Sequence, residues 1–156
     1  MRRFVEWLLN INIVSNRYYS IDSKRVLADL LVDEDKVTDE LVRELLLPYV
    51  GLSKAEDKII PKPEFTVLAY PQRVLLYLLA RHAMARLKIP GGSLAANPEK
   101  ITMGCLVPKK SCGETLSRLK AAGLVEKDKD GYLIPVHSLL RVAAEIRNAG
   151  KAKQKH

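Results

Sequence analysis

The amino-acid sequence predicts a mainly helical protein with a small β-hairpin, an α+β fold. Apolar residues recur at helical spacing through most of the chain, with Asn, Ser, Thr or Pro at the starts of these segments and Gly or Pro at their ends. After residue 123 this period gives way to two short apolar runs around a turn. The length of 156 residues, of which 47% are hydrophobic and 28% charged, fits one globular domain or two small ones.

Three helices are predicted in the first 60 residues, over residues 2–10, over residues 23–31 and in a segment that Thr38 caps. A charged turn at residues 33–36 separates the second helix from the third. The inward-facing residues of the third helix repeat at helical spacing, and they are Leu41, Val42, Leu45 and Leu46. Residues 1–60 are therefore interpreted as a helical N-terminal lobe.

The longest predicted helix begins at Pro71, runs to about Lys88 and is apolar on most of its circumference. A helix of this kind is buried or forms the seam of an oligomer. His82 lies on it, and a packed imidazole is the preferred interpretation over a catalytic one. The preceding residues 61–70 begin with Pro-Lys-Pro and are predicted to be a stiff linker to a second domain of residues 71–148.

A short helix is predicted from Pro98, with Asn97 as its N-cap, and it ends before Pro108 because a proline keeps the preceding residue out of the α region. A second helix, of residues 111–122, follows with Ser111 as its expected cap. Its apolar stripe has spacings of four and three and consists of Cys112, Leu116 and Leu119. Gly123 suits the left-handed conformation that closes a helix.

A hairpin follows, with a buried strand at residues 124–125, a turn at 128–131 and a returning strand at 132–134. The order of helix, turn, helix and hairpin over residues 97–135 resembles the winged helix-turn-helix of prokaryotic and archaeal transcriptional regulators, with residues 111–122 as the recognition helix. Two positions depart from that family: Leu106 stands where the turn often has glycine, and Gly113 lies early in the recognition helix.

The N-terminal lobe repeats part of this order, with helices, a Gly-Leu exit at residues 51–52 and a charged hairpin. Residues 1–60 are therefore either a diverged second winged helix or a generic helical lobe.

The resemblance implies that the recognition helix enters the major groove of DNA with its N-terminal residues nearest the base edges. Glu114 would accept a hydrogen bond from a cytosine amino group, although its charge opposes non-specific binding. The residues implied are Lys109, Lys110, Arg118 and Lys120 for phosphates, Ser111, Glu114 and Ser117 for bases, and Lys127 and Lys129 of the wing for a flanking backbone or minor groove.

The net charge of +8 is unevenly distributed along the chain. Residues 1–70 carry 10 basic and 12 acidic side chains, whereas residues 71–156 carry 16 basic and 6 acidic ones. This asymmetry predicts that the second half meets a polyanion. The expected function is sequence-specific or semi-specific binding of double-stranded DNA by a transcriptional regulator. The alternatives are a winged-helix protein–protein module in a larger assembly and, on charge alone, RNA or ribosome association.

Other partners are predicted from the helices. A second copy of the chain could pair through helix 71–88 or through a final helix of residues 139–148, for which packing on its own domain is the alternative. A protein partner could bind the N-terminal lobe. Residues 149–156 are basic, low in apolar residues and expected to be a disordered tail.

No catalytic, cofactor or metal site is predicted, because the sequence has no nucleophile elbow, no P-loop lysine and no zinc spacing of its two Cys and three His residues. Cys105 and Cys112 are interpreted as buried thiols, with a disulfide or redox switch as the alternative. No apolar run approaches the ~18 residues that span a membrane, and no signal-peptide core follows Met1. We therefore expect a cytoplasmic, nucleoid-associated protein that is not an enzyme.

Overall fold

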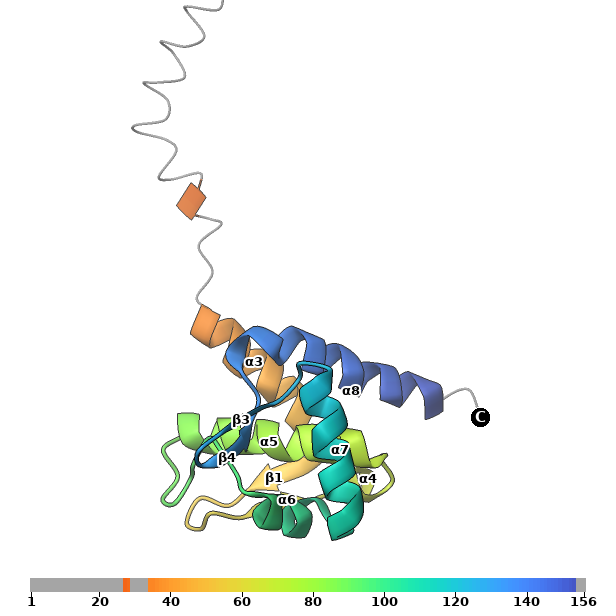
Figure 1. Cartoon of the computed structure of the whole chain (residues 1–156). Helices are drawn as coiled ribbons and strands as arrows, with labels where there is room; N and C mark the ends of the chain where they lie inside the picture. The colour runs from red at the N-terminus through yellow and green to blue at the C-terminus, as the bar shows by residue number, and fades with distance from the viewer. Residues whose placement is uncertain (1–26, 29–33, 154–156) are drawn as a thin grey trace, which may run out of the picture. The chain divides into compact units, whose positions relative to one another are not determined.

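The computed structural model describes residues 27–28 and 34–153 (Figure 1). The chain divides into two compact units, residues 1–37 and residues 38–156. The predicted helix at residues 2–10 lies outside the described residues, as does all but residues 27–28 of the one at residues 23–31. The question of a diverged winged helix in residues 1–60 falls largely on this part and stays a prediction.

The described chain is mainly helical with two antiparallel two-stranded hairpins, β1–β2 and β3–β4, so the predicted α+β class is confirmed. Its elements, in chain order, are α3 (Glu34–Leu46), β1 (Val50–Leu52), β2 (Ile59–Pro61), α4 (Pro63–Thr66), α5 (Tyr70–Arg86), α6 (Pro98–Cys105), α7 (Lys109–Ala121), β3 (Glu126–Asp128), β4 (Gly131–Leu133), the 3₁₀ turn η1 (Val136–Ser138) and α8 (Leu139–Lys153).

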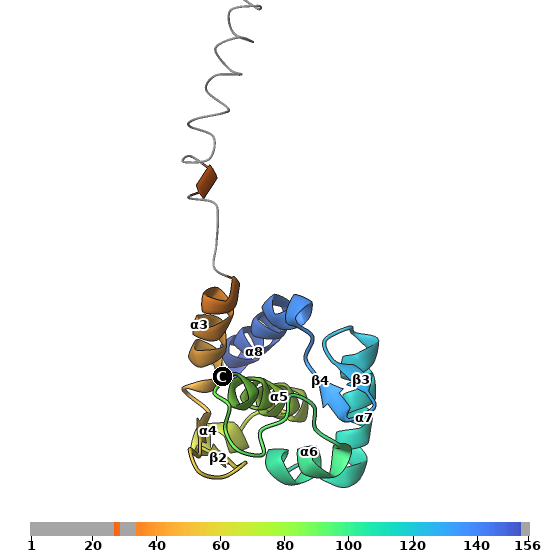
Figure 2. The ribbon, with the colours of Figure 1, turned by 90° about the vertical axis from the view of Figure 1, so that its left-hand side faces the viewer.

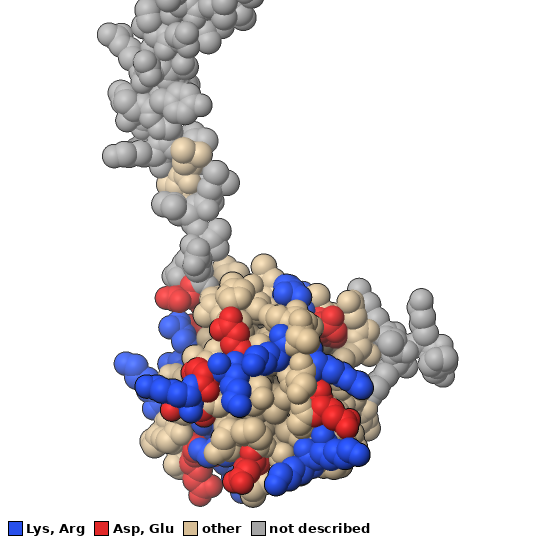
Figure 3. Space-filling view, viewed as in Figure 1, with Lys and Arg blue, Asp and Glu red and all other residues tan. Residues whose placement is uncertain are grey.

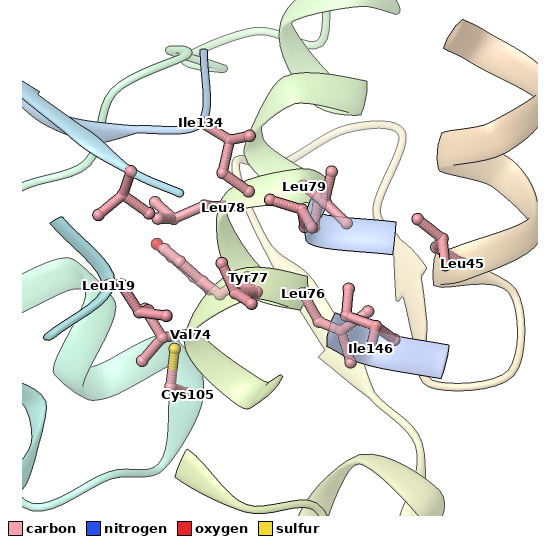
Figure 4. Close-up of a cluster of buried hydrophobic side chains, with 14 of the residues drawn as sticks. Leu45, Val74, Leu76, Tyr77, Leu78, Leu79, Cys105, Leu119, Ile134 and Ile146 are labelled. Carbon is pink, nitrogen blue, oxygen red and sulfur yellow. The ribbon is translucent and has the colours of Figure 1, made fainter. Parts of the chain in front are cut away.

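Helix α5 is the centre of residues 38–156, and Figure 2 shows α3, α6, α7 and α8 arranged around it. Every residue from 74 to 82 is buried, which requires neighbours on all sides of the helix. Leu76 points toward α3 and α8, whereas Val74 points toward Cys105 of α6 and Leu119 of α7 (Figure 4). The apolar circumference is thus covered within one chain. Residues 74–82 of α5 therefore present no exposed apolar face in the described structure, and pairing of two copies through this helix stays a prediction.

The predicted linker at residues 61–70 is wrong. Pro63 opens the short helix α4, and Phe65 and Leu68 are buried in the same core as α5. Arg73 of α5 holds this segment by donating from Nε to the Leu68 carbonyl (2.9 Å) and from Nη2 to the Thr66 carbonyl. Pro61 ends strand β2, and Pro63 starts a helix in place of a stiff linker.

The predicted domain boundary at residue 60 is also displaced. Helix α3 begins at Glu34, so residues 34–36 are helical and do not form the predicted turn. Thr38 lies inside the helix and is not its cap. Val42, Leu45 and Leu46 are buried as predicted, and they belong with Val50 of β1 to the core around α5. Residues 38–60 therefore form one unit with the second half of the chain.

Helix α8 continues to Lys153, past the predicted end at residue 148, so residues 149–153 are helical and not a disordered tail. Its inner side packs against the core as the packing alternative predicts, through Leu139, Val142, Ala143 and Ile146. Residues 154–156 lie outside the described residues.

The two cysteines are free, buried thiols, as the packing interpretation predicts. The Cys105 thiol donates a hydrogen bond to the Arg73 carbonyl oxygen, at a distance of 3.6 Å. Burial is the main cause that raises the pKa of the Cys105 thiol far above its usual range, and the neighbouring Cys112 raises it further. A thiol that stays protonated is a poor nucleophile, which argues against a redox switch in this state.

Candidate nucleic-acid interface

The turn between α6 and α7 is fixed from both of its sides. Asn97 caps α6 as predicted, since its side-chain oxygen accepts from the Lys100 N–H at 2.9 Å. At the other end Leu106, which stands where this turn often has glycine in the family that the sequence resembles, takes the left-handed conformation, with φ 55° and ψ 43°. Arg73 of α5 donates from Nη1 to the Leu106 carbonyl at 3.2 Å. The turn therefore relies on a contact from α5 in place of glycine.

Helix α7 begins at Lys109 and not at Ser111. Pro108 is the N-cap, with φ −58° and ψ 143°, and its carbonyl accepts a hydrogen bond from the Cys112 N–H at 2.8 Å. Proline has no side-chain oxygen, so the first-turn N–H groups of α7 have no side-chain cap. Ser111 lies inside the helix, half-buried at its edge. Unpaired N–H groups at a helix start favour a bound anion, and Lys109 and Lys110 now lie in that first turn.

The end of α7 is anchored to α8. Gly123 takes the predicted left-handed conformation, with φ 75°. Its N–H donates to the Lys120 carbonyl, and the Leu124 N–H donates to the Leu119 carbonyl, both at 3.0 Å. Ser138 Oγ donates to the Gly123 carbonyl at 2.9 Å, and Arg141 Nη2 donates to the Ala122 carbonyl at 2.6 Å. Side chains of η1 and α8 thus bond the two carbonyls that directly follow α7.

The inner face of α7 carries the predicted stripe of Cys112, Leu116 and Leu119, all buried, together with Thr115. The opposite face is open to solvent, and basic side chains with carboxylates among them cover this region in Figure 3. A shallow depression on this face brings together five of the predicted site residues with Gly113; its lining is Lys109, Lys110, Gly113, Glu114, Ser117 and Arg118. Lys120 is exposed but does not line the depression, and neither does Ser111.

The hairpin after α7 begins later than predicted. Leu124 and Val125 are buried but lie before β3, which pairs with β4 from Glu126 to Asp128. Two residues, Lys129 and Asp130, form the turn, in which Asp128 Oδ1 accepts from the N–H groups of Asp130 (2.7 Å) and Gly131 (3.1 Å). Leu124 and Val125 are therefore part of the hydrophobic core, and the strand pairing begins only after them, at Glu126.

The same hairpin is attached to the segment before α6. Tyr132 exchanges two backbone hydrogen bonds with Ala96, of 3.0 and 2.8 Å. Gly131, with φ 135°, lies so close to the Ala96 carbonyl that a Cβ would stand 2.3 Å from its oxygen. The hairpin is therefore held in place by the chain that leads into α6.

The β3–β4 hairpin carries both basic and acidic side chains. Lys127 and Lys129 are exposed as predicted, and the Lys127 ammonium lies 5.7 Å from the centre of the Tyr132 ring. Three carboxylates alternate with them, of Glu126, Asp128 and Asp130, and Glu126 lies 3.9 Å from His137 Nε2. This surface attracts phosphates less strongly than the exposed face of α7.

Three contributors to this site were missed from the sequence. Gly113 is exposed in the first half of α7, and a Cβ there would meet nothing within 4 Å, so packing does not require a glycine. Arg73 and Arg141 act on the turn and on the end of α7 from helices outside the predicted motif. Only the glycine had a sequence signal, as a poor helix former inside a predicted helix.

Among the described residues, no cluster of His, Cys, Asp and Glu could hold a metal ion. Within the same part of the chain, no helix is long and apolar enough to cross a membrane. No protein-family model, curated protein or solved structure matches this chain.

Proposed function

We propose that α5, α6, α7 and the β3–β4 hairpin form a winged helix-turn-helix, and that the protein binds double-stranded DNA through α7 as a transcriptional regulator. The observation that carries this proposal is the exposed face of α7, where Lys109, Lys110 and Arg118 line one depression with Ser117 and Glu114. Cations of this kind contact phosphates, and the hydroxyl and carboxylate contact base edges.

The support of α7 favours this function. Its inner face is buried in the core, its start follows a turn that Arg73 holds, and its end is bonded to α8. A recognition element needs this rigidity, because base contacts depend on positions within a fraction of an ångström. A helix of 13 residues is about 20 Å long at 1.5 Å per residue, and the major groove admits one.

Gly113 gives independent support. A glycine inside a helix costs about 1 kcal/mol relative to alanine, and no described neighbour of this residue requires it. Because glycine has no side chain, a ligand can approach the helix backbone closely at this position. A duplex lying against the depression would use that space.

A second candidate function, a winged-helix module that binds another protein, is favoured by two exposed apolar side chains beside the start of α7. Met103 of α6 is 78% exposed and Leu106 of the turn is 56% exposed. The carboxylate of Glu114 on the α7 face also suits a protein partner better than it suits phosphates.

Salt-dependent duplex binding tests the proposal. If the α7 and hairpin cations neutralise about 5 phosphates, log affinity should fall with log salt at a slope near −4 to −5. Replacing Lys109 and Lys110 together with Ala should flatten the slope by roughly 2 and weaken binding to all sequences alike. Fluorescence anisotropy with labelled duplexes at several salt concentrations measures both.

The matched control removes two lysines elsewhere. Lys54 and Lys58 are exposed in the β1–β2 loop, and their replacement with Ala should lower affinity less and leave the slope nearly unchanged. If both double variants flatten the slope equally, attraction is a property of the net charge and the α7 model fails. If the full chain shows no duplex binding at low salt, the protein-binding function takes its place.

A further inference from the structure

A second pocket lies away from the α7 face, between α3, β1 and the last turns of α5. Its volume is about 480 Å³, within the range of small-molecule sites. Most of its lining is apolar and comes from Val42, Leu46, Leu47, Val50, Leu52, Ala83 and Leu87. No sequence pattern predicts this pocket, because its α3 and α5 walls lie far apart along the chain.

His82 lines this pocket and is 8% exposed. Neither of its ring nitrogens has a hydrogen-bond partner in the described part of the chain. A buried polar group without a partner destabilises the fold, and a ligand group that accepts a hydrogen bond from it would relieve that cost. Burial is the main cause that lowers the pKa of the His82 ring, and the charge of Arg86 lowers it further. The ring is therefore neutral near pH 7 and carries one N–H donor.

Charged residues line the same pocket in two facing pairs. Asp39 and Arg43 lie one turn apart on α3, and His82 and Arg86 lie one turn apart on α5. The Asp39 carboxylate accepts from Arg86 at 3.1 Å (Nε) and 2.9 Å (Nη2), so these two charges balance each other. The second arginine, Arg43, leaves the pocket with one net positive charge. An anionic head group with an apolar body complements this lining.

We propose that this pocket binds an amphipathic monocarboxylate of medium chain length. Its hydrocarbon body packs against the valines and leucines of α3 and β1, and its carboxylate accepts from the His82 N–H and faces the guanidinium of Arg43. Only a single carboxylate fits the charge, since one net cation is present and Asp39 repels a second anion. The inference goes beyond DNA binding and does not depend on it.

Isothermal titration calorimetry on the full chain, without DNA, tests this with decanoate and with decan-1-ol, which has the same tail and no charge. We expect one decanoate per chain and at least tenfold weaker binding of decan-1-ol. Arg43→Gln and His82→Gln should each weaken decanoate binding at least tenfold and leave decan-1-ol binding unchanged. The matched control is Lys100→Gln, an exposed cation on α6 that lines neither pocket, which should bind decanoate like the unaltered chain.

Three outcomes would overturn the proposal. One is no saturable decanoate binding; another is equal affinity for decanoate and decan-1-ol, which would make the site merely apolar. The third is unchanged decanoate affinity in Arg43→Gln, whose exposed side chain does not support the core. Circular dichroism of each variant establishes that the fold is retained before binding is compared.

Discussion

Gly104 of α6 lies directly against the ring of Tyr77 of α5. A Cβ added to Gly104 would stand 2.1 Å from Cε2 of that ring and 2.6 Å from Cδ2. Tyr77 is 6% exposed and part of the core, so the ring has little room to move. The two helices therefore approach as closely as glycine permits, and α6 in turn positions α7.

Replacement of this glycine should be costly. Gly104→Ala is expected to lower the free energy of unfolding by about 1–3 kcal/mol, because the methyl group overpacks a filled core. Urea unfolding followed by circular dichroism measures the change. Gly51→Ala is the control, since its nearest contact would be 4.0 Å away. Equal effects at the two positions would mean that the α5–α6 contact is less tight than described.

The exposed glycine of α7 should behave in the opposite way. Gly113→Ala is expected to raise the free energy of unfolding by up to ~1 kcal/mol, because the methyl group meets nothing and helix propensity improves. Gly113→Leu should keep this stability but lower duplex affinity at least tenfold if the duplex approaches α7 here. Full affinity in Gly113→Leu would place the bound duplex elsewhere.

The inner stripe of α7 predicts large stability losses. Leu116 and Leu119 are 1% and 6% exposed, so Leu116→Ala and Leu119→Ala should each lower the free energy of unfolding by about 2–5 kcal/mol. Leu140→Ala in α8 is the control, because that side chain is 74% exposed and should change stability by less than about 0.5 kcal/mol. Chemical denaturation gives all three values. Mild effects at both α7 positions would contradict its placement.

Shortening the chain from its N-terminal side tests which residues are needed for folding and for duplex binding. A piece of residues 38–156 should fold and bind duplex DNA within about threefold of the whole chain, because it contains the compact unit and the α7 face. A piece of residues 71–156 should not fold, since it lacks Phe65 and the buried residues of α3 and β1. Circular dichroism and anisotropy report on folding and binding. A folded, fully active 71–156 would restore the domain boundary expected from the sequence.

The buried imidazole predicts a pH dependence. The pKa of His82 is lowered from its ordinary value of 6.5, so the unfolded chain binds a proton at a higher pH than the folded chain. The stability associated with the neutral ring is therefore fully present above pH 6.5 and is lost as pH falls below it toward the folded pKa. His82→Gln should reduce the loss of stability between about pH 7 and 5.

Local signals were sufficient for much of the helical framework. Asn97 and Pro98 placed the start of α6, Gly123 placed the end of α7, and the spacing of Leu116 and Leu119 identified its buried face. Each of these signals acts within one or two turns of the chain. Whether the assembled elements act as a winged helix on DNA stays a prediction.

Long-range packing explains what could not be predicted. Prolines at residues 61 and 63 read locally as a linker, but Phe65 between them and α5 is buried by elements distant in sequence. Leu106 adopts a left-handed conformation, and its carbonyl accepts a hydrogen bond from Arg73, 33 residues earlier. The pocket around His82 likewise exists only when α3 lies against α5.

The burial of residues 74–82 of α5 ties the two candidate sites to a single cooperative unit. Its residues 74–82 form the wall behind α7 on one side and, through His82, part of the second pocket on the other. If α7 or α3 separated from α5, buried residues of α5 would be exposed to water. Amide protons of α5 should therefore exchange with solvent only when residues 38–156 unfold as a whole, more slowly than those of α7 or of the β3–β4 hairpin.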